Sequence, residues 1–372
     1  MNPLLYRALA SAWRRSLLAA SGVATSALLV VVLVASYRNL TSAVESYVGQ
    51  PGIDLWIAPL GTDNLIRSSA LLDEGTLGAA RAVPGVRRAD PLLRSFVSAH
   101  HASDDRAPLS LLVLGYEAPT GLGGPPRITE GRAPRRVREV VLDRASAFQL
   151  GVDVGGRVQL NGVETRVVGI SDETNLLATQ FAFLTRESAS GASGFGERVS
   201  FVAVQLVRDA DGDAVAREIE ARLPGVSVYA REQFVERNVR EVAAGFRPLL
   251  LIVCVVGMAA AAVLVSLLIH AVVDDRARDI AVLLALGAPI TRVTLSVLTH
   301  AIVLVMVGGA LGASLSCAFR SALARWFPTV GLVIHAHDVL TIVLVLCVAA
   351  LASAYAPLVR LRRIDPVEAF RA

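Results

Sequence analysis

Four apolar runs, each long enough to cross a bilayer, constrain this 372-residue chain more than any other feature. A transmembrane helix needs about 20 predominantly apolar residues to cross the ~30 Å hydrocarbon layer. The runs that reach this length are residues 17–36, 249–273, about 293–319 and 339–358. The mean hydropathy of +0.56 is also high for a water-soluble protein. The sequence therefore predicts an integral membrane protein with four transmembrane helices.

The arginines beside these runs predict the orientation of the chain. Arginine clusters precede the first run, lie between the second and the third, and follow the fourth. Because cytoplasmic loops of membrane proteins carry an excess of basic residues, both termini are expected in the cytoplasm. The long stretch of residues 37–245 is then expected outside the cytoplasm. The third-to-fourth loop, with Arg320 and Arg325, fits this orientation less well.

The first run has an alternative interpretation as a cleaved signal peptide, because basic residues precede it and small residues end it at Ala35 and Ser36. The apolar core of a signal peptide usually has about 7–15 residues, which is shorter than this run. Residues 1–16 also have the pattern of an amphipathic helix at a membrane surface. An uncleaved anchor that follows a cytoplasmic amphipathic helix is therefore favoured.

All 36 residues counted as Lys and Arg are arginine. ATP hydrolysis at a phosphate-binding loop needs the motif G-x-x-x-x-G-K-[ST], whose lysine reaches the β- and γ-phosphates, and the sequence has neither this motif nor any lysine. We therefore expect this chain to be no enzyme, with no catalytic residue, cofactor or metal of its own. The net charge of +4, without basic clusters interleaved with aromatic residues, also argues against nucleic acid as a partner.

Residues 37–245 have the composition of a water-exposed domain and a repeated order of elements. Residues 53–58 alternate as a strand, residues 71–82 suit a helix, and a second extended run reaches Val97. The same order of strand, helix and strand recurs over residues 199–229. Two such halves predict a ferredoxin-like split βαβ layer. The expected fold class is thus a helical membrane protein with an α+β extracytoplasmic domain.

Between the two halves, a β-rich insert is predicted at about residues 127–187. Asn161-Gly162 lies between two alternating runs, and both residues tolerate a positive φ, so a tight hairpin is expected there. The strand predicted at residues 109–116 could belong to the first layer or to the insert. Beyond the second half, residues 232–245 form a charged helical stretch that predicts a rigid stalk. It runs into the second apolar run without a clear break except Pro248.

Three sets of segments resemble the permease subunits of the MacB/FtsX-like superfamily of ABC transporters, particularly four-span DevC-like and LolC-like members without a fused ATPase. Residues 275–288 are similar to the family's E-R-x-R-E-I-x-x-x-x-A-x-G-A segment after the second span. The tail at residues 363–371 is similar to its I-x-P-x-E-A-L-R ending. Residues 130–134, 139–142 and 167–170 resemble its external core domain. Asp275 and Asp279 depart from the usual Glu.

The resemblance implies a permease subunit in the bacterial cytoplasmic membrane. It would couple ATP hydrolysis by a separate cytoplasmic ABC ATPase to substrate export or to mechanotransmission, with ATP and Mg²⁺ bound by that partner. It also implies a homodimer of this permease in membrane lipid, with an envelope protein as a further candidate partner. The alternative is a membrane-anchored sensor or scaffold whose external domain regulates an envelope protein without transport. No residue selects a substrate.

The cytoplasmic loop of residues 274–292 is the expected contact for the ATPase. On a helix that begins at Asp275, apolar residues recur at three-to-four spacing while charges gather in the first turn. A glycine after this helix is a natural C-terminal stop. A solvated loop whose charges only enforce topology is the alternative, and the resemblance favours the coupling role. The expected coupling residues are Asp275, Arg276, Arg278, Asp279, Ile280, Leu283, Leu286, Gly287 and Ala288.

Gly308, Gly309 and Gly312 form a small-residue face in the third run, which permits close approach of another helix. Helix packing or dimerisation is the expected role. His335 and His337 near the outer end of the fourth run could bind a metal or haem, but the pattern shows no cysteine or acidic partner for them, so a position at the membrane interface is favoured. The remaining segments are an external loop at 320–338 and a cytoplasmic tail at 359–372.

Overall fold

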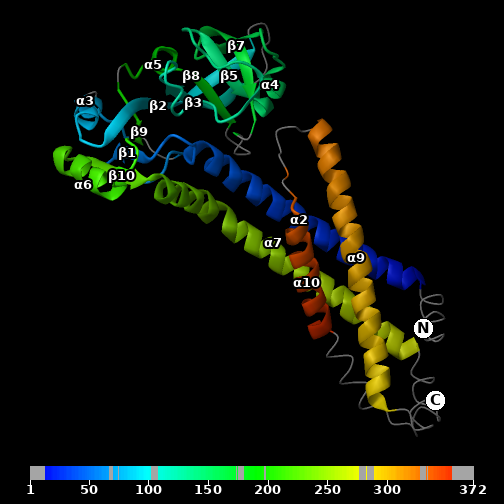
Figure 1. Cartoon of the computed structure of the whole chain (residues 1–372). Coiled ribbons are helices and arrows are strands. Elements are labelled where there is room, and N and C mark those ends of the chain that lie inside the picture. The colour runs from blue at the N-terminus through cyan, green and yellow to red at the C-terminus, as the bar shows by residue number, and fades with distance from the viewer. Residues whose placement is uncertain are drawn as a thin grey trace. The chain divides into compact units, whose positions relative to one another are not determined.

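The computed structural model describes residues 13–66, 70–73, 75–101, 108–172, 174, 180–196, 198–275, 282, 289–326, 332 and 334–353. The chain divides into two compact units, and Figure 1 shows the elements of both. The membrane unit comprises Met1–Ser36, Arg247–Ala322 and Leu332–Ala372. The α+β unit comprises Tyr37–Phe246 and Leu323–Gly331.

Apolar helices build the membrane unit. They are α2 (Trp13–Val48), α7 (Arg231–Asp275), α9 (Ile290–Trp326) and α10 (Ala336–Ser353). Within the described residues, α2, α7 and α9 are long and apolar enough to cross a membrane, and α10 is a shorter apolar helix. These helices agree with the four predicted spans. The end of the predicted fourth span, residues 354–358, lies outside the described part of the chain.

Small and β-branched side chains fill the core of the membrane unit. Val23 and Ala27 of α2 pack with Val265 of α7 and Val305 of α9. The opposite faces of the helices expose large apolar side chains, such as Leu295, which is 65% exposed. Lipid tails are as apolar as leucine, so such exposure is expected of a bundle that lies in a bilayer.

The two βαβ halves of the α+β unit form one antiparallel layer. They are β1 (Leu55–Pro59), α3 (Gly75–Arg81) and β2 (Val86–His101), then β9 (Phe201–Leu206), α6 (Gly212–Arg222) and β10 (Val226–Ala230). The strand order is β10-β1-β9-β2, so strands of the two halves alternate across the layer. This interleaving is that of a split βαβ fold, and it confirms the ferredoxin-like prediction.

The insert extends the same sheet. Its elements are β3 (Leu109–Tyr116), β4 (Ile128–Gly131), β5 (Glu139–Asp143), α4 (Arg144–Leu150), β6 (Arg157–Leu160), β7 (Val163–Ser171), β8 (Gln180–Thr185) and α5 (Arg186–Ser193). The long strand β2 pairs with β9 along its first part and with β3 and β6 along its second. One sheet of ten strands therefore runs through the described residues. The sequence did not decide whether β3 belongs to the first layer or to the insert. In the structure it pairs with β8 of the insert and with the second part of β2.

The Asn-Gly hairpin is present between β6 and β7. Asn161 has φ 45° and Gly162 has φ 82°, as a tight turn with two positive φ angles requires. The Asn161 side chain also accepts a hydrogen bond from the Ser98 amide at 2.8 Å and donates one to the Ala192 carbonyl at 2.9 Å. The turn is thus tied to β2 and to the end of α5.

Helices cover both faces of the ferredoxin-like layer. Leu55 and Ile57 of β1 pack on the face that carries α3 and α6. Trp56 and Ala58 point to the opposite face, where they pack with residues from the end of α2 and the start of α7. Because successive strand residues alternate between faces, a strand covered on both sides is buried along its whole length, as β1 is.

Candidate functional site

Phe234, near the start of α7, is the centre of an aromatic cluster on the ferredoxin-like layer. Its ring lies 5.2 Å from Trp56 of β1, 5.6 Å from Tyr229 of β10 and 6.0 Å from Phe201 of β9, measured between centroids. Phe234 is fully buried. Aromatic pairs at such separations contribute about 0.5–1.5 kcal/mol each beyond their burial. One side chain of α7 therefore binds this helix to three strands.

Tyr47 holds the end of α2 in a similar way. Its ring lies 5.5 Å from Phe181 and 5.8 Å from Phe183, both on β8, and its hydroxyl donates a hydrogen bond to the Gly123 carbonyl at 2.9 Å. The Trp56 indole N–H donates to the carbonyl of Val48, the last residue of α2, at 3.1 Å. The helix end is thus fixed to the insert and to the ferredoxin-like layer.

Asn238 is a buried polar residue one helical turn after Phe234. Its side-chain oxygen accepts a hydrogen bond from the Leu65 amide at 2.7 Å, and its side-chain nitrogen donates one to the Phe234 carbonyl at 2.7 Å. Its neighbour Arg237 lies 3.6 Å from Asp63 and stacks on the ring of Tyr229. The chain segment after β1 is thereby fastened to α7.

We call these contacts the helix junction: residues 40–48 of α2 and 234–246 of α7, with the strand and loop residues that they touch. The sequence predicted a stalk here but not how the stalk attaches. A signal was present, because Asn238 interrupts an apolar stripe at four-residue spacing between Phe234 and Val242. Its partner Leu65 is far away in sequence, so the pattern alone could not identify the contact.

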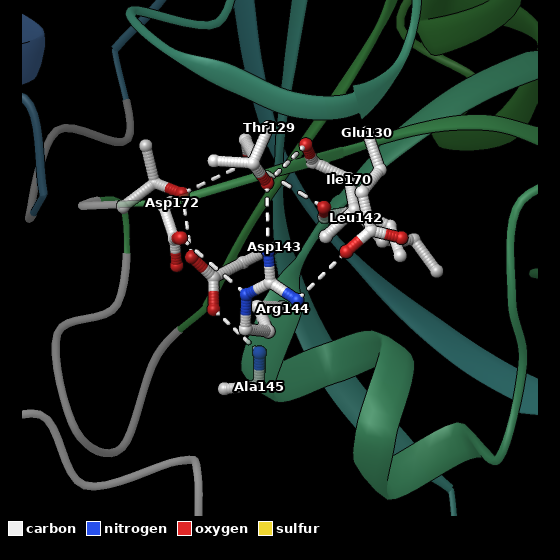
Figure 2. Close-up of polar contacts among 10 residues, drawn as sticks. Thr129, Glu130, Leu142, Asp143, Arg144, Ala145, Ile170 and Asp172 are labelled. Atoms are coloured by element: carbon white, nitrogen blue, oxygen red, sulfur yellow. Dashed lines mark hydrogen bonds and ion pairs between the residues drawn. The ribbon is translucent and has the colours of Figure 1, made fainter. Parts of the chain in front are cut away.

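A second polar arrangement lies in the insert, where β5 meets α4 (Figure 2). Asp143 is only 2% exposed, and its carboxylate accepts hydrogen bonds from the Ala145 amide at 2.9 Å and the Thr174 hydroxyl at 2.7 Å. Burial raises the pKa of Asp143 to about 6, although both hydrogen bonds oppose this shift. A titratable carboxylate thus holds the start of α4 to the connection between β7 and β8.

Arg144 completes this network on the outer side. Its guanidinium donates to Glu130 at 2.9 Å, to Asp172 at 3.4 Å and to the Thr129 hydroxyl at 2.8 Å (Figure 2). It therefore joins β4 to the end of β7. No motif in the sequence indicated this network, and the local signal was an aspartate between a strand and a helix, the usual place of a helix cap.

The glycine face of α9 lies against neighbouring helices of the same chain. A Cβ atom on Gly308 would lie 2.8 Å from Val23 of α2, and one on Gly312 would lie 2.7 Å from the Ala24 carbonyl oxygen. A Cβ on Gly309 would lie 2.9 Å from Val343 of α10. These glycines permit the close packing of α9 on α2 and α10. Dimerisation through this face stays a prediction.

The predicted coupling residues lie almost entirely outside the described chain. Asp275 is the last residue of α7. The others, Arg276, Arg278, Asp279, Ile280, Leu283, Leu286, Gly287 and Ala288, are not among the described residues. Their coupling role therefore stays a prediction.

The statement that His335 and His337 lack an acidic partner is wrong. Asp338 lies 3.8 Å from the His335 imidazole and 3.1 Å from that of His337, because the start of α10 brings the three side chains together. The Asp338 side chain is 12% exposed, whereas the imidazoles are largely exposed. Among the residues that the structure describes, no group of three or more His, Cys, Asp or Glu has the arrangement of a metal site.

Comparisons with known proteins place these features in a family. The MacB-like periplasmic core domain matches residues 16–222, and the FtsX-like permease C-terminal domain matches residues 251–366. An uncharacterized ABC transporter permease of Mycobacterium bovis is 25% identical over 362 residues, which cover 96% of each chain. A probable export ATP-binding/permease protein of Pseudomonas fluorescens is 24% identical over 256 residues, which cover 65% of this chain and 39% of that protein.

Among solved structures, the periplasmic region of MacB from Actinobacillus actinomycetemcomitans aligns with a TM-score of 0.39 and 14% identity, covering 50% of this chain and 93% of that one. The match to the periplasmic core domain takes in more than half of the sequence, and the permease domain follows it in the expected order. The chain therefore belongs to the FtsX-like permease family with a MacB-like periplasmic core domain.

Proposed function

We propose that this chain is the permease subunit of an ABC transporter and that a separate cytoplasmic ATPase drives it. Family membership and relatives named as ABC transporter permeases support this role. The Pseudomonas fluorescens relative is named as an ATP-binding and permease protein in one chain, and similarity to this chain covers 39% of it. A second subunit would then supply ATP hydrolysis and hold ATP and Mg²⁺.

The proposed arrangement is a homodimer in the bacterial cytoplasmic membrane, with both termini in the cytoplasm and the α+β unit outside. The excess of arginine in the predicted cytoplasmic segments supports this orientation. The coupling loop after α7 would then face the ATPase. Membrane lipid surrounds the helices, and an envelope protein could be contacted by the α+β unit.

The observation that carries the proposal is the helix junction. α2 and α7 are each one continuous helix, and each contributes both an apolar membrane segment and a buried end in the α+β unit. α7 continues through Pro248, so the predicted stalk and the second span are one element. A helix displaced at its cytoplasmic end would therefore move the layer that Phe234 and Asn238 hold. Such motion would serve substrate export or mechanotransmission.

Copurification tests this proposal. The full-length chain, tagged and expressed with the ATPase encoded beside its gene, should retain that ATPase in detergent. Arg276→Glu should lower the recovered ATPase at least about tenfold, since reversing a charge at a protein contact costs several kcal/mol. Arg217→Glu, an exposed position on α6, is the matched control and should leave recovery unchanged. If the wild-type chain retains no ATPase, the sensor or scaffold function replaces the permease.

A further inference from the structure

The segment between β4 and β5, residues 132–138, contains four arginines, and we call it the arginine loop. Buried Glu139 organises it. The Arg132 guanidinium donates two hydrogen bonds to the Glu139 carboxylate at 2.8 and 2.5 Å, and the amides of Arg135 and Arg136 donate to the same group at 2.8 and 3.1 Å. These contacts, with Arg132 foremost, lower the pKa of Glu139 to about 2. The carboxylate is therefore ionised at any physiological pH.

The first end of the loop is pressed onto β7. The Arg132 amide donates to the Val168 carbonyl at 2.9 Å. Gly131 has φ 77°, and a Cβ there would lie 2.2 Å from the same carbonyl oxygen. A Cβ on Gly169 would lie 2.5 Å from the Arg132 carbonyl oxygen. Both glycines are required because the two backbones approach too closely for any side chain.

The other end is fixed at Arg138, which has a left-handed backbone with φ 62°. Its amide donates to the Ser188 hydroxyl at 3.0 Å, and its carbonyl accepts from the Arg166 amide at 2.8 Å. A residue other than glycine in this conformation costs of order 1–3 kcal/mol, and such strain is found most often at functional sites. The loop is thus held rigid at both ends.

The rigid loop presents side chains that take no part in the core. Arg135, Arg136, Val137 and Arg138 are all exposed, Val137 to 48%. Exposed Arg166 adjoins them on β7. Within the described residues, the guanidinium groups of Arg135, Arg136 and Arg166 make no ion pair, whereas nearby Arg157 is neutralised by Glu164 at 2.7 Å. The surface therefore combines unneutralised positive charge with an apolar side chain.

We propose that the arginine loop and Arg166 form a docking surface for an acidic face of a partner protein. Arginine binds carboxylates through two parallel hydrogen bonds and is enriched at protein interfaces. Because Glu139 fixes the loop beforehand, little conformational entropy is lost on binding. Exposed Glu187 is next in sequence to Ser188, which accepts the hydrogen bond of the Arg138 amide. An anionic bilayer would repel this glutamate, whereas a folded protein can meet it with a basic residue. This partner is additional to the ATPase, and the docking surface does not depend on whether an ATPase drives the chain.

Fluorescent poly-L-glutamate is the probe for the test, with the full-length chain in phosphatidylcholine nanodiscs. Binding followed by anisotropy should be saturable, and Arg135→Gln with Arg136→Gln should weaken it at least about tenfold. Arg87→Gln with Arg88→Gln, an exposed adjacent pair at the start of β2, removes the same charge and should change binding less than about twofold. Equal weakening by the two pairs would show that the probe follows net charge, and the docking surface would be refuted.

The Glu139→Gln variant distinguishes two explanations of binding: a loop that is prearranged by Glu139, and attraction by net positive charge alone. This variant removes one negative charge from the chain, which should favour an anionic probe, but it also removes the group that organises the loop. We therefore expect it to bind poly-L-glutamate at least about threefold more weakly. Unchanged or stronger binding, in a variant that circular dichroism shows to be folded, would contradict it. A final experiment measures binding to an anionic membrane by flotation with phosphatidylglycerol vesicles. If Arg135 and Arg136 are required for vesicle binding but not for poly-L-glutamate, the surface binds lipid and the proposal is wrong.

Discussion

Asp143 gives the α+β unit a pH dependence of unusual sign for an aspartate. Burial raises its pKa from 3.8 to about 6, with nearby Asp172 adding to the shift and the hydrogen bonds of Thr174 and Ala145 opposing it. The folded protein therefore binds this proton more tightly than the unfolded chain does. The resulting stabilisation, ~3 kcal/mol, is complete below about pH 4 and is lost as the pH rises through 6.

Asp143→Asn should remove this dependence and stabilise the α+β unit at pH 8 by about 1–3 kcal/mol. The amide can still accept from the Ala145 amide and can donate to Thr174, so it imitates the protonated acid. This change in stability is measured by thermal unfolding, monitored through the fluorescence of Trp56 in a chain whose Trp13 and Trp326 are replaced by Phe. The opposite shift of Glu139 acts only below about pH 4.5, so the two effects separate. A variant less stable at pH 8, with the wild-type slope, would refute this account.

Asn238 should be the most sensitive polar position of the helix junction. Asn238→Ala leaves the Leu65 amide buried without its acceptor, which costs about 1–3 kcal/mol. Arg240→Ala, two residues later, removes an exposed ion pair with Glu236 and should cost less than about 1 kcal/mol. Chemical denaturation of the full chain, read at Trp56, compares the two variants. Equal losses would mean that the Leu65 contact contributes nothing particular.

At the scale of helices, the glycine face of α9 makes a directional prediction. Gly312→Val places a branched side chain against the Ala24 carbonyl and Ala27 of α2, so the two helices must separate. Overpacking of this kind costs about 1–3 kcal/mol or more. Ala310→Val, on the exposed face of the same helix, should be nearly neutral. The midpoint of heat-induced aggregation in detergent is the readout, and matching midpoints for the two variants would disprove the packing role.

Local signals in the sequence predicted most of the elements. The Asn161-Gly162 turn, the two βαβ halves and the apolar runs follow from periodicity and backbone preference, which act over a few residues. The helix junction could not be predicted in the same way. Phe234 meets Trp56 and Phe201 only because two strands distant in sequence, β1 and β9, pair with each other, and Asn238 finds its partner across the fold. The role of Asp338 beside His337 was missed although the two residues are adjacent.

The arginine loop shows the same division between local pattern and tertiary contact. The sequence indicated a family segment around Gly131 and Gly169, without a reason for either glycine. The structure gives the reason, since both allow the loop to lie against β7. Its link to Glu139 depends on how β4 and β5 are placed around β7, which no local pattern specifies.

At the scale of the whole molecule, the proposed function requires a chain that responds to an ATPase and performs no ATP chemistry itself. Among the described helices, α2 and α7 each have residues in both units, as do the last residues of α9, and α2 and α7 carry the helix junction. Weakening the helix junction with Phe234→Ala should therefore leave ATPase binding intact while lowering the transported or transmitted output. Copurification measures ATPase binding, and an export or partner-activation assay on the same preparation measures output. The two readouts should change independently in this variant. Loss of ATPase binding would argue against it.

The permease function is tested by ATP hydrolysis in nanodiscs that hold this chain and its ATPase. The chain alone should hydrolyse no ATP, because it has no lysine for a phosphate-binding loop. The assembled complex should hydrolyse ATP faster than the ATPase alone, and Arg276→Glu should return the rate to that of the free ATPase. Hydrolysis by the chain alone, or a complex whose rate equals that of the free ATPase, would contradict the account.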